Sequence, residues 1–81
     1  MTVTLSQTVL EALAEAPVPV QKAFIKQLNF LIRNLKHPSL HAKKYDEGAD
    51  FWQARVNDDR RFYFRVAGDE YRVFKLIPHP K

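Results

Sequence analysis

The sequence predicts an α+β fold, in which two N-terminal helices pack on one face of a small twisted antiparallel β-sheet. Apolar residues recur at spacings of three and four before residue 36, and from about Lys43 they alternate with polar residues. Turn residues separate the alternating segments. Helices followed by strands are typical of α+β folds. At 81 residues we expect one domain spanning residues 1–81.

The first helix is expected to begin after Ser6, whose hydroxyl can cap the first turn. Val3-Thr4-Leu5, just before it, predicts a very short strand or an extended lead-in. Pro17 and Pro19 are expected to end the helix and make a turn. One helical face carries Val9, Leu10 and Leu13.

A second helix is predicted roughly from Val20 to Leu35, and Pro38 stops it by disfavouring a helical conformation at His37. We expect the two helices to form an antiparallel pair. The apolar stripe of the second helix consists of Val20, Phe24, Leu28, Leu31, Ile32 and Leu35.

Three strands follow, and their alternation assigns each side chain to a face of the sheet. The predicted strands are Phe51–Val56, Arg61–Val66 and Tyr71–Ile77. The face expected to pack on the helices carries Trp52, Ala54, Val56, Phe62, Phe64, Val66, Phe74 and Leu76. The opposite face is expected to carry Gln53, Arg55, Arg61, Tyr63, Arg65, Tyr71 and Lys75.

The charge of this chain is uneven. All 13 Lys and Arg residues follow Val20, where seven acids leave a net charge of +6. A basic, aromatic-rich surface indicates an anionic partner, although a solvated basic surface has the same composition.

The absence of cysteine excludes disulfides and thiolate metal sites. With no apolar run near the roughly 20 residues of a membrane helix, we expect a cytoplasmic protein without a membrane segment.

The cationic face suggests a site for phosphate. Guanidinium groups match phosphate oxygens, and tyrosine rings such as Tyr63 can stack on bases. The alternative is an ordinary exposed face with Arg–acid pairs, but the nearby acids fall mostly in turns. The candidate cations on this face are Arg55, Arg61, Arg65 and Lys75.

Two further positions carry candidate chemistry. His79, between two prolines, suits proton transfer near neutral pH, and otherwise it is simply solvated. Lys43-Lys44 can clamp a phosphate or supply a base, and otherwise forms a basic turn.

Three histidines without cysteine or close spacing give only a weak metal signal, and no glycine-rich phosphate loop is present. We therefore expect no metal and no cofactor.

The order of these segments resembles that of toxins of the RelE/ParE superfamily of bacterial toxin–antitoxin systems. The resemblance covers nearly the whole chain and is strongest where Arg55 on the tryptophan strand is followed six residues later by Arg61. The segments that carry it are His37-Pro38-Ser39-Leu40, Lys43-Lys44-Tyr45, Phe51–Val56, Arg61-Phe62-Tyr63-Phe64 and Ile77-Pro78-His79.

The resemblance implies helices packed on a twisted sheet and an antitoxin protein that wraps and inhibits the toxin. In the RelE-like branch it implies a metal-independent endoribonuclease that cleaves mRNA, commonly in the ribosomal A site. The ParE-like branch instead inhibits DNA gyrase and has no known nuclease site. A further alternative is a sheet that binds single-stranded RNA without toxicity.

The RelE-like resemblance also implies residue roles. Arg55 and Arg61 match positions that stabilise charge and contact phosphate, and His79 matches a C-terminal acid or base. Lys43 or Lys44 falls near the segment that bears the base. Secondary RNA contacts are expected from Lys44, Arg65, Tyr63, Lys75 and Lys81.

Two positions depart from the family pattern. Gln53 stands where some members have a second base on the tryptophan strand. Lys81 either substitutes for a further C-terminal Arg or Tyr, or that role is missing.

Overall fold

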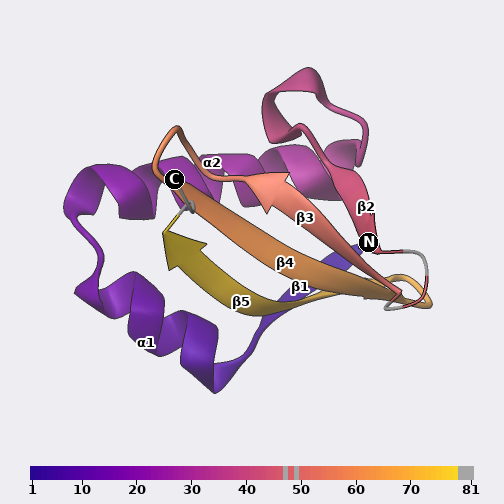
Figure 1. Ribbon diagram of the computed structural model, residues 1–81, viewed down its shortest axis with the longest axis horizontal. Helices are drawn as coiled ribbons and strands as arrows, with labels where there is room; N and C mark the ends of the chain where they lie inside the picture. Colours follow the sequence, from indigo (N-terminus) through magenta and orange to yellow (C-terminus); the bar gives the residue numbers. More distant parts are fainter. Residues whose placement is uncertain (47, 49, 79–81) are drawn as a thin grey trace.

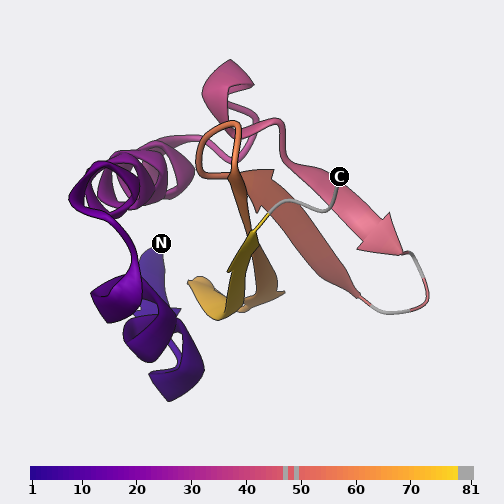
Figure 2. The same cartoon turned by 60° about the vertical axis from the view of Figure 1, so that its left-hand side comes forward.

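The computed structural model describes residues 1–46, 48 and 50–78. Within this part of the chain, five strands form one sheet in the order β1-β5-β4-β3-β2 (Figure 1). Both helices lie on the same side of the sheet, as Figure 2 shows. The elements are β1 (Thr2–Leu5), α1 (Gln7–Glu15), α2 (Val18–Arg33), the short 3₁₀ helix η1 (Pro38–Leu40), β2 (Lys43–Asp46), β3 (Phe51–Arg55), β4 (Arg60–Ala67) and β5 (Glu70–Pro78).

The sheet is mixed, which corrects the prediction of a purely antiparallel sheet. β1 pairs with β5 in parallel, from Thr2 opposite Glu70 to Leu5 opposite Val73. The other neighbouring strands pair antiparallel, as predicted. The residue pattern of β1 indicates a strand but not its direction, because the position of its partner depends on the path of the whole chain.

A serine cap begins α1, and prolines mark the start of α2. At α1, the Ser6 Oγ accepts a hydrogen bond from the Val9 amide at 3.2 Å, as the sequence predicted. α2 begins at Val18 rather than Val20, because Pro19 is tolerated in a first turn whose amides have no helical partners. Pro19 therefore belongs to α2 and not to the turn.

The core lies between the helices and the sheet face that they cover. Phe24 of α2 packs edge-on against Phe62 of β4, with ring centroids 5.4 Å apart. Val9 contributes from α1 and Leu40 from η1. The largest side chains that are fully buried are Phe24, Phe62, Phe64, Leu31, Leu40, Val9 and Val73.

No helix in the described residues is long and apolar enough to cross a membrane.

A β-bulge in β5 changes which side chains face the core. Lys75 lies opposite Tyr63, but Val73 lies opposite Phe64, so Phe74 is the extra residue. Since one inserted residue reverses the alternation, Tyr71 turns into the core, where it is 6% exposed.

The bulge therefore corrects two assignments. Tyr71, predicted on the cationic face, packs edge-on against the core ring of Phe64 at 5.5 Å. Phe74, predicted in the core, instead contacts Tyr63 on the opposite face. Val66 was also predicted in the core, but it is 44% exposed at the far end of β4.

Candidate nucleic-acid interface

The outer face of the sheet, defined as the face turned away from the helices, carries side chains in cross-strand rows. Arg55 of β3 lies directly opposite Arg61 of β4. Farther along the sheet, Arg65 lies opposite Arg72. Between these arginine pairs runs a row of successive partners from four strands, made of Lys43, Gln53, Tyr63 and Lys75. The predicted cations Arg55, Arg61, Arg65 and Lys75 thus share one face.

The register separates the two candidate lysines. Lys43 lies opposite Gln53 and belongs to the outer-face row. Lys44 lies opposite Trp52, on the face that carries the core, and its Nζ is 3.6 Å from the Asp50 carboxylate. Of the two, Lys43 is therefore the one that shares a face with the arginine pair.

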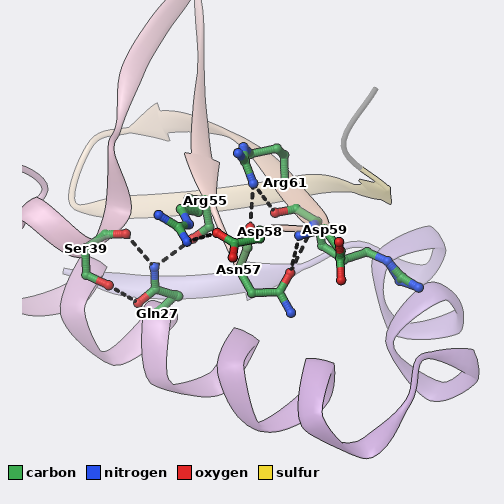
Figure 3. A network of polar contacts seen from close by, with 8 residues as sticks. Gln27, Ser39, Arg55, Asn57, Asp58, Asp59 and Arg61 are labelled. Carbon is green, nitrogen blue, oxygen red and sulfur yellow. Dashed lines mark hydrogen bonds and ion pairs between the residues drawn. The ribbon is translucent and has the colours of Figure 1, made fainter. Parts of the chain in front are cut away.

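The loop between β3 and β4 holds the Arg55–Arg61 pair in place (Figure 3). Arg55 forms an ion pair with Asp58. The Arg61 Nη1 donates to the carbonyl oxygens of Asn57 at 2.5 Å and of Arg60 at 2.9 Å. The Asn57 Oδ1 in turn accepts from the amides of Asp59 and Arg60 at 2.9 and 3.0 Å. These bonds fix the turn and orient the guanidinium of Arg61.

Gln27 of α2 anchors the start of this loop to the helices. Its Nε2 donates to the carbonyl oxygens of Arg55 at 2.8 Å and of Ser39 at 2.9 Å. Its Oε1 accepts from the Ser39 hydroxyl at 2.9 Å (Figure 3). Gln27 is 3% exposed and is the one buried polar or charged side chain among the described residues.

Sequence reasoning did not identify Gln27. The available signal was its position, three residues after Phe24 and four before Leu31, which places an amide within the apolar stripe.

Two like charges face each other in the Arg55–Arg61 pair. The pKa of Arg61 is lowered from its ordinary value, first by burial of the guanidinium and then by repulsion from Arg55, while Asp58 acts in the opposite direction. The guanidinium stays charged at neutral pH. Like charges opposite each other destabilise a sheet, so an anion binding between them would relieve the repulsion.

Aromatic rings occupy the centre of the outer face, but they pack mainly on one another. Tyr63 contacts Phe51 and Phe74, and its hydroxyl accepts from the Gln53 Nε2 at 3.0 Å. Since Tyr63 is only 7% exposed, its ring is not free to stack on a base as the sequence suggested. Tyr45, which sequence reasoning did not select, is 55% exposed and stacks on Phe51.

No protein-family model and no curated protein matches this chain in sequence. Among solved structures, a YoeB/ParE toxin from Agrobacterium tumefaciens is similar, with a TM-score of 0.82 and 13% identity over 99% of this chain and 100% of that one. The chain has the YoeB/ParE toxin fold.

Two further structures share this fold. A YoeB–YefM complex from Staphylococcus aureus gives a TM-score of 0.78 and 16% identity, over 96% of this chain and 95% of the other. A copper-bound mutant toxin from Helicobacter pylori gives a TM-score of 0.65 and 15% identity, over 98% of this chain and 94% of the other.

The end of β5 pairs with the start of β4. Ile77 lies opposite Arg61, and Pro78 lies opposite Arg60. His79 and Lys81 are outside the described residues. Within the described residues, no three His, Cys, Asp or Glu side chains are grouped to hold a metal ion.

Proposed function

We propose that this protein is the toxin of a type II toxin–antitoxin pair and that it cleaves mRNA without a metal ion. The observation that carries the proposal is the Arg55–Arg61 pair, two arginines at directly opposed positions of neighbouring strands on the outer face of a YoeB/ParE fold. Planar guanidinium groups bind phosphate through paired hydrogen bonds. A pair of them on an exposed sheet face suits one phosphate of a flexible RNA strand.

Cleavage requires the 2′-hydroxyl of the RNA to attack the adjacent phosphorus. The bond from phosphorus to the 5′-oxygen of the next nucleotide then breaks, leaving a 2′,3′-cyclic phosphate and a 5′-hydroxyl. Negative charge builds up on the phosphorane oxygens, and Arg55 and Arg61 stabilise it electrostatically. The bonds from Arg61 Nη1 to the loop carbonyls keep the guanidinium oriented before RNA binds.

Proton transfer needs a base for the 2′-hydroxyl and an acid for the leaving 5′-oxygen. We assign the base to Lys43, because it is the candidate lysine that shares the outer face with the arginine pair. Gln53, its neighbour in the row, carries an amide that does not act as a base. His79 is assigned the acid, since the ordinary pKa of histidine lies near neutrality. Lys75, opposite Tyr63 in the same row, is assigned an RNA phosphate contact.

The proposed partners are a cognate antitoxin and mRNA, with the ribosomal A site as the place of cleavage. A structurally similar chain is found in the YoeB–YefM complex of Staphylococcus aureus. An antitoxin that covers the outer face would block access of RNA to Arg55 and Arg61.

The test is cleavage of mRNA by the purified protein in EDTA, with and without ribosomes. We expect products with cyclic phosphate ends, and we expect the Arg61→Ala, His79→Ala double variant to lose cleavage. Arg33→Ala is the matched control, because Arg33 is an exposed arginine at the end of α2. Retained cleavage by a folded double variant would reject the site.

One observation favours a second candidate, a ParE-like inhibitor of DNA gyrase. Gln53 occupies the centre of the outer-face row with a group that does not act as a base. Inducing the protein in bacteria separates the two functions. A nuclease stops translation first, whereas a gyrase inhibitor stops replication first.

A further inference from the structure

The outer face contains a second candidate site, at the opposite end of β4 from Arg61. A groove of about 370 Å³ lies over β1, β5 and β4, and its polar lining includes Thr4, Ser6, Arg65 and Arg72. Phe74, the extra residue of the β5 bulge, supplies an aromatic wall. The volume is at the lower end of the range for small-molecule sites, which is roughly 300–1,000 Å³.

The two arginines of this groove are held differently. Arg72 Nε donates to the Glu70 carboxylate at 2.7 Å, and the Thr4 hydroxyl donates to the same carboxylate oxygen at 3.2 Å. The Arg65 guanidinium has no acid partner among the described residues, and it lies over the Phe74 ring, 4.4 Å from its centroid. Arg65 is therefore an exposed cation that is oriented by an aromatic ring.

The opposition of Arg65 and Arg72 repeats the arrangement of Arg55 and Arg61. Like charges directly opposite each other are unfavourable, and the single carboxylate of Glu70 neutralises one of the two. A phosphate placed between them would neutralise the other. The Ser6 hydroxyl accepts from the Val9 amide, which leaves its own hydrogen available to a phosphate or sugar oxygen.

We propose that this groove binds one nucleotide of a single-stranded RNA, through its phosphate on Arg65 and Arg72 and with its base or sugar against Phe74. The inference rests on the proposed function and extends it to the RNA that flanks the cleaved bond. Arg61 and Arg65 are four residues apart on one strand, which is about 13 Å at ~3.3 Å per residue. A short single strand can reach both, so the groove would set the direction in which RNA crosses the sheet.

The test compares two uncleavable probes, 2′-O-methyl oligoribonucleotides of three and eight nucleotides. Arg65→Gln should weaken binding of the longer probe by about tenfold, because it removes one charge-assisted hydrogen bond to a phosphate. For the longer probe, the slope of log K against log salt concentration should become shallower by about 0.7, as expected for the loss of one phosphate contact. Binding of the shorter probe, which Arg55 and Arg61 suffice to hold, should change less than about twofold.

Arg33→Gln is the control, since it removes the same charge from α2. Equal losses from Arg33→Gln and Arg65→Gln, or unchanged binding of the longer probe, would overturn the groove as a nucleotide site. If Arg65→Gln weakened binding of a polyglutamate peptide as much as binding of the RNA, the groove would be a site for acidic chains, and the nucleotide proposal would also be overturned. Tight RNA binding that depends on Arg65, without any cleavage, would leave the groove standing and reject the nuclease.

Discussion

Replacing Gln27 with leucine tests whether α2 supports the candidate site through a buried amide. The substitution keeps a side chain of similar size but removes the donor that bonds the carbonyl oxygens of Ser39 and Arg55. A buried polar group left without a partner costs about 1–3 kcal/mol. Two such carbonyls, offset in part by the added apolar surface, predict a loss of about 2–4 kcal/mol in the free energy of unfolding.

The assay is urea unfolding followed by fluorescence of the single tryptophan, Trp52, which packs against the core. Gln21→Leu is a matched control on the same helix. The Gln21 Nε2 also donates to two backbone carbonyls, of Leu13 and Ala16, but Gln21 is only half-buried. Water can replace its bonds, so we expect a loss of about 1 kcal/mol. Equal losses in the two variants would refute the reasoning.

Three other predictions follow from the same structure. Phe24→Ala removes a fully buried ring and should lower the free energy of unfolding by about 3–5 kcal/mol, measured by the same urea titration. Asp58→Asn frees Arg55 from its ion pair and should tighten binding of a short RNA by about two- to fivefold, since exposed pairs contribute up to roughly 1 kcal/mol; weaker binding would contradict it. The hydrogen bond from Arg72 lowers the pKa of Glu70 below its ordinary value. The stability that the ionised Glu70 carboxylate contributes is therefore present above the ordinary glutamate pKa and is lost as the pH falls through the lower pKa of the folded state. Glu70→Gln should therefore reduce the loss of stability on acidification below about pH 4.5, and an unchanged acid profile would argue against this ion pair.

Features set by neighbouring residues were predictable from the sequence. The Ser6 cap depends on a local hydroxyl, and the placement of Arg55 and Arg61 on one face of the sheet depends on alternation within each strand. Both features agree with the sequence, whereas the direct opposition of Arg55 and Arg61 was found only in the structure. The two N-terminal helices and the helix-covered face of the sheet were predicted for the same reason.

Features set by distant contacts were not predictable. Alternation cannot reveal a bulge, because an inserted residue changes the face of Tyr71 and Phe74 without changing their order. The parallel pairing of β1 depends on where the helices return the chain. The sequence does not distinguish Gln27 from an ordinary polar helix residue, because its partners, the carbonyls of Ser39 in η1 and Arg55 in β3, are distant in the chain.

The central claim is that Arg55 and Arg61 act on one phosphate, and a double-mutant cycle on RNA cleavage tests it most directly. Rates are compared for the wild-type protein, Arg55→Ala, Arg61→Ala and the double variant. If both guanidinium groups contact the same phosphorane, their effects are not additive, with a coupling of about 0.5–3 kcal/mol. Strictly additive losses, or full activity in both single variants, would contradict the account.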